Sequence, residues 1–473
     1  MDILNSSSYS IHKTYSEKMK GLTEKKVTEE ELIKKAKRPE KEAMKLHPYY
    51  KGKMQTVPKC SIWGFDAFSV WYTPGVAAPC LAIKEDKEQV YEHTNKSNII
   101  AVVSDGTRVL GLGDIGPEAA MPVMEGKSLL FKYLGGVDAV PLCLNTKDPE
   151  DIIRTVKLIQ PSFGGINLED ISKPKCYKVL EALRNDPEVE IPVFHDDAQG
   201  TGTVVLAGVL GALKFVGKEL DQAKIAMLGV GAANTRTAYL LIAAGADPNN
   251  IIMCDSKGIL NDKRQDVIAQ KEYDPFKYDL AHKTNKDDIS GDFGDATKGA
   301  DVVISAARSK PGTIKEEWIS HMAKDSIVFA CANPLPEIWP WDAKDAGAKV
   351  VGTGRSDFPN QINNSLGFPA IFRGALDVHA KTITDEMCIA AAHALVEVAE
   401  KNGLKEDYVI PKMSETEVYL LEATRVGMKA IEQGIARNEM EEEELYKIVS
   451  EKIKYARNLT DLLMETNYIK PRI

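Results

Sequence analysis

The amino-acid sequence predicts an α/β protein with two doubly wound domains and a helical C-terminal segment. The chain has 473 residues, and at about 100–200 residues per domain this is enough for two or three domains. Short apolar runs alternate with helical stretches, a pattern typical of a parallel sheet covered by helices. A glycine-rich turn after one apolar run indicates that the second domain is a Rossmann-like, dinucleotide-binding domain.

Residues 1–59 are polar and rich in Lys and Glu, which predicts a helical N-terminal arm. Thr28 and Glu31 have the spacing of a capping box at the start of that helix.

Residues 60–200 form the first predicted α/β domain. Its strands are predicted at the apolar runs Ile99–Val103, Ala139–Leu144 and Ile191–Phe194. Helical patterns at Asp151–Ile159 and Lys175–Arg184 separate them.

The second α/β domain is predicted for residues 201–383. It begins with an apolar, small-residue helix at Thr201–Val216, and the strand Lys224–Leu228 follows. Its later apolar runs are short, as expected of strands buried on both faces. These runs are Ile251–Cys254, Asp301–Ala306, Ser326–Ala332 and Lys349–Val351.

Residues 384–473 are predicted to be helices that pack back on the body of the protein. Thr384 and Ser414 mark the starts of two of them, and a last helix spans roughly Met440–Met464.

Composition excludes several classes of protein. Lys and Arg total 60 against 69 Asp and Glu, and a net charge of −9 argues against nucleic acid as a partner. No run approaches the ~18 apolar residues of a membrane span, so we expect no membrane partner. Seven cysteines without a CxxC pair indicate reduced thiols. The first twenty residues lack a secretory pattern, so we expect a cytoplasmic protein.

The turn after Leu228 carries the dinucleotide-binding pattern. Gly229 permits the turn, and Gly231 lets the backbone approach a pyrophosphate at the N-terminus of the next helix, which begins at Ala232 and Ala233. Asn234 stands where a third glycine is usual. Taken alone, the motif also fits a tight turn without a ligand.

The next predicted strand ends at Asp255, where a ribose hydroxyl is usually bound. A carboxylate there favours NAD because it repels a 2′-phosphate. Ser256 and Lys257 follow at once, and they favour NADP because both can bind that phosphate. We expect NADP and leave NAD open; Lys257 is equally well explained as a solvated surface residue.

Two acid pairs close predicted strands. Glu169 and Asp170 follow one strand, and Asp196 and Asp197 follow another. Ligands bind at this edge of an open sheet, where clustered carboxylates repel one another unless a cation intervenes. Oxygen ligands predict Mg²⁺ or Mn²⁺ held by Glu169, Asp170 and Asp197. We expect Asp196 to orient a ligand rather than bind the ion, and His195 to be a packed residue.

Several motifs are richer in glycine than their surroundings require, and with the features above they resemble the malic enzyme family in its smaller bacterial and archaeal form. The resemblance covers about residues 45–400 in order. It is carried by Ser69–Ala77, Ser104–Gly116, Met124–Ser128, Asn167–Asp170, His195–Gly202, Ala332–Glu337 and Thr353–Asn364.

The resemblance implies a role for each of these motifs, in an N-terminal malic-type domain and a cofactor domain. Lys127 is the implied base and Tyr72 the implied acid. Arg108 is implied to bind a substrate carboxylate, while Asn333 and Asn364 contact both substrate and nicotinamide; Thr201 is implied in cofactor binding. An ammonium group beside a divalent cation can have its pKa lowered enough to act as a base near neutrality.

The resemblance also implies a homodimer, in which one partner completes the pocket of the other. Residues 305–312 depart from the family, since they are less rich in glycine and more basic than the usual cofactor loop.

The function predicted is oxidative decarboxylation of L-malate to pyruvate and CO₂ with reduction of NAD(P). One alternative is a malolactic reaction with bound NAD. A plain 2-hydroxy acid dehydrogenase is a second alternative, although hydride transfer alone needs no metal. A non-catalytic nucleotide sensor on the same fold is a third, and it would be expected to lack the base or a metal ligand.

Overall fold

The computed structural model describes residues 29–473, with side chains from residue 38 onward, and these residues form two units, 29–53 with 470–473, and 54–469. In the first unit, helix α2 (Glu29–Tyr50) agrees with the predicted helical arm. The Tyr50 hydroxyl donates a hydrogen bond to the Lys470 carbonyl over 2.9 Å. The capping box predicted at Thr28 lies outside the described residues.

The first sheet has four parallel strands in the order β2-β1-β3-β4. Helices α7 (Pro149–Ile159) and α8 (Lys175–Arg184) pack on one face, and α6 (Pro117–Gly135) packs on the other. The predicted strands are therefore confirmed, including the one that precedes Glu169 and Asp170. The strands are β1 (Ile99–Ser104), β2 (Asp138–Cys143), β3 (Gly165–Leu168) and β4 (Val193–His195).

The second sheet has six strands in the order β10-β9-β8-β5-β6-β7, and all pairs except β6–β7 are parallel. The antiparallel β7 was not predicted, because two residues carry no apolar pattern. The strands are β5 (Ile225–Leu228), β6 (Ile251–Asp255), β7 (Gly258–Ile259), β8 (Val302–Ser305), β9 (Ile327–Ala330) and β10 (Val350–Thr353).

Short helices connect the strands of this second sheet and cover its faces. They are α10 (Ala232–Ala243), α11 (Gln265–Ile268), α12 (Pro275–Lys283), α13 (Phe293–Thr297), α14 (Glu316–Ser320) and α15 (Pro340–Asp345), with the single turns η5 (Pro248–Asn250) and η6 (Asn364–Leu366).

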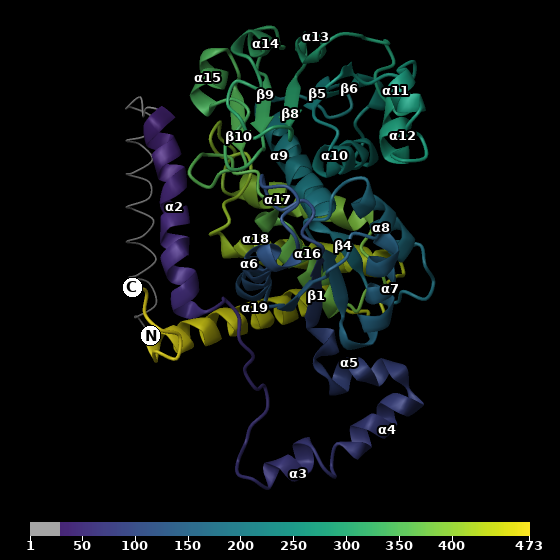
Figure 1. The fold of residues 1–473 in the computed structure, drawn as a ribbon, viewed down its shortest axis with the longest axis vertical. Helices are drawn as coiled ribbons and strands as arrows, with labels where there is room; N and C mark the ends of the chain where they lie inside the picture. Colours follow the sequence, from purple (N-terminus) through teal and green to yellow (C-terminus); the bar gives the residue numbers. More distant parts are fainter. Residues whose placement is uncertain (1–28) are drawn as a thin grey trace. The chain divides into compact units, whose positions relative to one another are not determined.

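Helix α9 (Thr201–Val216) joins the two sheets and runs between them (Figure 1). Among the described residues, one helical stretch, Asp196–Val216, is long and apolar enough to cross a membrane, with a mean hydropathy of 1.3. Its most apolar window is 72% buried inside the protein, as in the core helix of a folded domain. Its apolar character is therefore accounted for by the core.

The C-terminal region is helical, as predicted. Thr384 caps α17 by accepting a hydrogen bond from the Met387 N–H. The cap predicted at Ser414 is wrong: Glu415 occupies that position without a side-chain cap, because its carboxylate accepts from Tyr408, Asn402 and the Lys412 N–H. The helices are α16 (Phe368–Asp377), α17 (Asp385–Lys401), α18 (Thr416–Glu432) and α19 (Glu442–Glu465).

The segment before β1 is helical and unusually exposed. Helices α3 (Ala67–Trp71) and α4 (Ala77–Glu85) expose large apolar side chains to solvent, including Val70 at 51% and Leu81 at 58% exposure, and Phe65, just before α3, is 92% exposed. The turns that follow are η1 (Lys87–Gln89), α5 (Val90–His93) and η2 (Asn95–Ser97), and η3 (Gln160–Ser162) follows α7. All seven cysteines are free thiols, as the composition predicted.

Candidate active site

The predicted acid pairs meet at one edge of the first sheet. Strands β3 and β4 pair with Leu168 opposite His195, so the residues that follow each strand emerge side by side. Oxygen atoms of Glu169, Asp170 and Asp197 lie within 4.8 Å of one another. The Asp170 N–H donates to Asp197 Oδ2 over 2.8 Å, which fixes the two loops against each other.

The electrostatics of this cluster favour a bound cation. Burial and then the neighbouring carboxylates raise the pKa of Asp170 to about 9 and also raise the pKa of Glu169. Asp170 Oδ2 is buried and has no hydrogen-bond partner. Several buried oxygens that repel one another fit a hard divalent cation such as Mg²⁺ or Mn²⁺.

Lys127 reaches this cluster from helix α6. Its Nζ lies 2.9 Å from Glu169 Oε1, forms a second ion pair with Asp196, and sits 4.0 Å from the centre of the Phe368 ring. Burial lowers the pKa of Lys127, but Asp196 and Glu169 outweigh this effect and hold it above its ordinary value. The lowered pKa expected from the sequence depends on a divalent cation beside Lys127 and stays a prediction; the expectation did not include the opposing effect of Asp196.

Asp196 is more central than the sequence indicated. Its fully buried carboxylate contacts the Lys127 ammonium and accepts a hydrogen bond from Asn364 Nδ2 over 2.6 Å. A side chain at Gly200 would collide with its Oδ1, so glycine is required there. His195 is a packed residue as predicted: burial lowers its pKa to about 4, and Nδ1 accepts from the Ala198 N–H.

The substrate-binding candidates lie on loops around the cluster. The Arg108 backbone N–H donates to the Asp170 carbonyl over 2.9 Å, while its exposed guanidinium donates to the Leu110 carbonyl. A Cβ on Gly111 would lie 3.5 Å from the Asn333 carbonyl, so the loops of Arg108 and Asn333 touch. Asn364 is joined directly to Asp196.

Tyr72 is separate from this group. It ends helix α3 with 71% of its surface exposed. Within the part of the chain that the structure describes, its hydroxyl makes no hydrogen bond to Lys127 or to the acid cluster. Within a single chain, the implied acid Tyr72 and the implied base Lys127 are therefore not in contact in the part of the protein that the structure describes.

The glycine turn has the geometry of a cofactor site. Gly229 adopts φ 98°, and a Cβ there would lie 3.0 Å from the Ala306 carbonyl. Asn234, in place of a third glycine, donates to the Leu228 and Gly229 carbonyls and holds the turn. A Cβ on Gly231 would meet nothing within 4 Å, which leaves room at the start of α10.

The end of β6 is more basic than the sequence indicated. Asp255 accepts two hydrogen bonds from Arg264, at 2.8 and 3.0 Å, and pairs with Lys277 of α12 at 2.6 Å. Burial raises the pKa of Asp255, but these two cations outweigh it and lower the pKa. Lys257 is exposed, as Ser256 is, and pairs with Asp266 at 3.2 Å.

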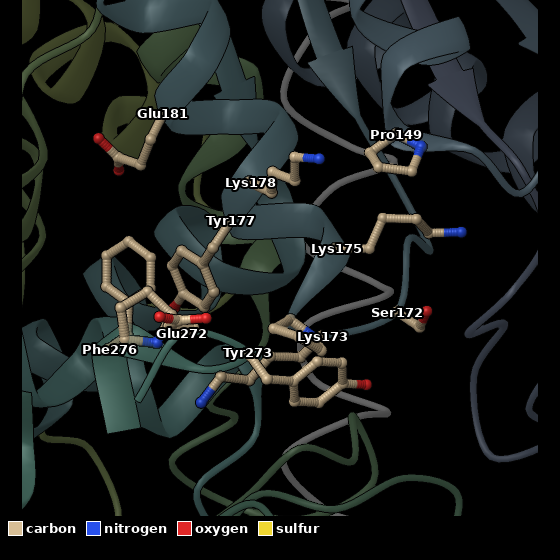
Figure 2. Close-up of a pocket in the computed structure, with 12 residues that line it drawn as sticks. Pro149, Ser172, Lys173, Lys175, Tyr177, Lys178, Glu181, Glu272, Tyr273 and Phe276 are labelled. Atoms are coloured by element: carbon tan, nitrogen blue, oxygen red, sulfur yellow. The ribbon is translucent and has the colours of Figure 1, made fainter. Parts of the chain in front are cut away.

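A cavity of 720 Å³ lies between α8 and the start of α12 (Figure 2). Tyr177 and Phe276 stack in its wall with their centres 4.5 Å apart. Lys173 Nζ donates to the Val230 carbonyl, and the Tyr177 hydroxyl donates to the Ala232 carbonyl. The cavity therefore adjoins the glycine turn.

Comparison with known proteins identifies the family. The profile of the malic enzyme N-terminal domain matches residues 52–151, and that of the malic enzyme NAD-binding domain matches residues 198–431. The chain belongs to the malic enzyme family. Its fold is that of a malic enzyme, with a malic N-terminal domain and a Rossmann-like NAD-binding domain.

Relatives and solved structures agree with this assignment. The chain is 48% identical over 404 residues to the bifunctional malic/malolactic enzyme of Bacillus subtilis, covering 85% of this chain and 96% of that protein. It is 48% identical to the NAD-dependent malic enzyme of Geobacillus stearothermophilus, covering 82% and 78%. The crystal structure of Entamoeba histolytica malic enzyme superposes with a TM-score of 0.91 at 45% identity, covering 94% and 93%.

Sequence reasoning missed three features of this malic enzyme family member. The contact between Asp196 and Asn364 joins residues 168 positions apart, which no local pattern reveals. The same holds for Lys277, which reaches Asp255 from another helix. Glu337 is buried and accepts from Ser305, Ala307 and Ala332, so it ties together the ends of β8 and β9. The only available signal for Glu337 was its place in a family motif.

Proposed function

We propose that this chain catalyses the oxidative decarboxylation of L-malate to pyruvate and CO₂, with reduction of NAD(P) and with Mg²⁺ or Mn²⁺ bound at Glu169, Asp170 and Asp197. The observation that carries the proposal is Lys127, a buried ammonium group held between Glu169 and Asp196 at the edge of the three-carboxylate cluster. A plain dehydrogenase has no use for this cluster, and a nucleotide sensor has no use for the lysine.

The bound cation would supply positive charge beside C2 of malate, which favours loss of the hydroxyl proton and stabilises the enolate that decarboxylation produces. The remaining steps belong to the protein. Lys127, in its neutral amine form, takes the hydroxyl proton and becomes an ammonium as hydride leaves C2 for the nicotinamide. Asp196 and Glu169 raise the pKa of Lys127. The positive charge of a bound divalent cation would oppose this effect and return the pKa of the amine toward the range of a base.

Residues around Lys127 would hold the substrate in place. Arg108 is suited to a malate carboxylate, because its charged side chain is exposed beside Asp170. Asn364 and Asn333 approach from the cofactor domain, and Asn364 is already oriented by its hydrogen bond to Asp196. Asp196 keeps the Lys127 ammonium aimed at the cluster.

Protonation of the enol at C3 requires a donor, and we assign it to Tyr72 of a second copy of the chain in a homodimer. Tyr72 is exposed, as are the apolar side chains of Phe68, Trp71 and Leu81 in the same segment of the chain. Several large apolar side chains exposed in one segment are typical of an interface between subunits. Seven free thiols agree with a reducing compartment, and we propose the cytoplasm.

We propose NADP as the preferred nucleotide, with NAD as the alternative. Asp255 is paired with two cations, Arg264 and Lys277, and Lys257 follows it in sequence, so the local field does not reject a 2′-phosphate. The aromatic cavity beside the glycine turn is suited to the adenosine half of the nucleotide, and Thr201 lies at the start of α9 beside Gly200.

Product analysis tests the proposed function. The purified protein is incubated with L-malate and Mn²⁺, and with NADP or NAD, and pyruvate, lactate, oxaloacetate and CO₂ are measured. We expect pyruvate and CO₂ in equal amounts, with faster turnover on NADP. Lactate as the main product would support the malolactic alternative, and oxaloacetate without CO₂ would support a plain dehydrogenase.

A further inference from the structure

Arg355 lies between the two loops that carry Asn333 and Asn364. The first loop follows β9, and the second runs from the end of β10 to η6. These loops come very close: a Cβ on Gly354 would lie 2.5 Å from Asn333 Nδ2 and 2.7 Å from the Cys331 carbonyl. A fixed distance between the loops is a requirement if both asparagines are to contact one substrate.

The Arg355 side chain bonds to both loops. Nη1 donates to the Pro334 carbonyl over 3.0 Å, next to Asn333. Nε and Nη2 donate to the two carboxylate oxygens of Asp357, each over 2.8 Å, within the second loop. The residue is 9% exposed, and its guanidinium lies 5.5 Å from the centre of the Phe358 ring. Because each of its three nitrogens donates a hydrogen bond, the planar guanidinium forms a rigid connection between the two loops.

The connection continues to the active site. The Asn363 side chain donates to the Gly354 carbonyl over 3.4 Å and accepts from the Ser365 N–H, which caps the turn η6 that begins at Asn364. Asn364 then donates to Asp196. Hydrogen bonds and neighbouring residues of the backbone therefore connect Pro334, through Arg355, Gly354 and the Asn363–Asn364 pair, to Asp196, which holds Lys127.

We propose that Arg355 is a positioning residue that sets the spacing between Asn333 and Asn364 for malate oxidation, acting through the Pro334 carbonyl and Asp357 rather than by contact with substrate. This inference rests on the proposed roles of the two asparagines. The two hydrogen bonds from Arg355 to the Asp357 carboxylate neutralise the charge of the guanidinium, which argues against a direct role of Arg355 in binding a substrate carboxylate.

The test compares two variants. Arg355→Lys keeps the positive charge but loses the paired hydrogen bonds to Asp357, and Asp357→Asn keeps the arginine but removes the carboxylate that those hydrogen bonds require. We expect both to lower kcat/KM for malate, by about 10²-fold for the lysine variant, because small misplacements of positioning groups have effects of this size. The dissociation constant of NADPH alone should change little. Arg425→Ala, which removes an arginine from the surface of α18, is the control and should behave as wild type.

A double-mutant cycle separates positioning from a general loss of stability. If Arg355 acts through Asn333, the Arg355→Lys and Asn333→Ala variants combine non-additively, and the double variant is hardly worse than Asn333→Ala alone. Near-UV circular dichroism of the stacked Trp339 and Trp341, whose rings lie near Phe358, should change in Arg355→Lys. Wild-type melting temperatures would show that folding is intact.

Several outcomes would overturn the inference. Wild-type kcat/KM in Arg355→Lys would mean that charge alone matters, and wild-type behaviour of Asp357→Asn would mean that the fork is unimportant. Additive effects in the cycle would also contradict positioning. By contrast, normal malate turnover in Asn333→Ala and Asn364→Ala would refute the proposed roles of those asparagines, independently of Arg355.

Discussion

At the scale of single residues, the site depends on charges that come together only in the folded chain. Lys127 and Asp196 are 69 positions apart, and both are almost completely buried. The family motifs were sufficient to predict the three metal ligands and the lysine as candidates. They did not predict the pairing of Lys127 with Asp196, because a buried ion pair between distant segments leaves no local sequence pattern.

Lys127→Ala should abolish malate oxidation while the protein still binds nucleotide. We expect kcat to fall by about 10²–10⁴-fold, the usual contribution of a general base. Because Lys127 lies at the acid cluster and not at the glycine turn, the dissociation constant of NADPH, measured by fluorescence, should be unchanged. Lys132→Ala on the same helix, which removes an ion pair to Asp138, is the control. Near-normal turnover in Lys127→Ala would refute its assignment as the base.

The acid cluster should make stability depend on pH and metal. The folded-state pKa of Asp170 is about 9, above its unfolded value of 3.8, so its contribution to stability is present at low pH and is lost as pH rises toward 9. The melting temperature in EDTA should therefore fall between pH 6 and 9, while added Mn²⁺ should raise it more at pH 9 than at pH 6.

Asp170→Asn serves as the control for this measurement, because it removes the titrating group and one ligand. Its melting temperature in EDTA should vary less with pH, and Mn²⁺ should stabilise it less. An equal effect of Mn²⁺ at both pH values in the wild-type protein would contradict the proposed ligand set.

At the scale of elements, apolar runs and the glycine turn were enough to predict most strands and the long helices. Strands β1 and β5 and helices α7 and α8 were placed to within two residues, because buried segments have continuous apolar patterns. Elements without such a pattern were missed. The two-residue β7 has no apolar pattern of its own and is defined by its pairing with β6. Ser414 does not have the predicted capping role, because Glu415 occupies the cap position and its carboxylate bonds to Asn402, Tyr408 and the Lys412 N–H.

Helix α12 carries Lys277, on which the predicted preference between NADP and NAD depends. Lys277 and Arg264 together neutralise Asp255, so Lys277→Ala should leave this carboxylate with Arg264 alone and make the site less favourable for a 2′-phosphate. We expect KM for NADP to rise by about tenfold, and KM for NAD to change less. Lys257→Ala should shift the same ratio by a smaller factor, since Lys257 is paired with Asp266 at the surface. An unchanged ratio of the two KM values in both variants would remove the basis for NADP preference.

At the scale of the whole molecule, the exposed segment of α3 and α4 is the feature that one chain does not explain. A folded chain buries such side chains when it can, and here Phe65, Trp63 and Tyr72 remain more than half exposed. The homodimer that we propose would cover these side chains and would bring Tyr72 to the Lys127 of the other subunit. The sequence could indicate this arrangement only through the family resemblance.

Mixing two inactive variants tests the shared site. Lys127→Ala and Tyr72→Phe homodimers are mixed in equal amounts, subunits are exchanged, and pyruvate formation is measured. If each site combines Lys127 of one chain with Tyr72 of the other, half of the dimers contain one intact site, and about a quarter of wild-type activity returns. If both residues act within one chain, no activity returns.

The central claim is that Glu169, Asp170 and Asp197 hold the cation that malate decarboxylation requires. Binding of Mn²⁺ followed by electron paramagnetic resonance, in parallel with release of CO₂ from malate, tests it most directly in wild type, Asp197→Asn and Lys127→Ala. We predict one bound Mn²⁺ per chain in wild type and in Lys127→Ala, and loss of both Mn²⁺ binding and CO₂ release in Asp197→Asn. Wild-type Mn²⁺ affinity or CO₂ release in Asp197→Asn would contradict the claim.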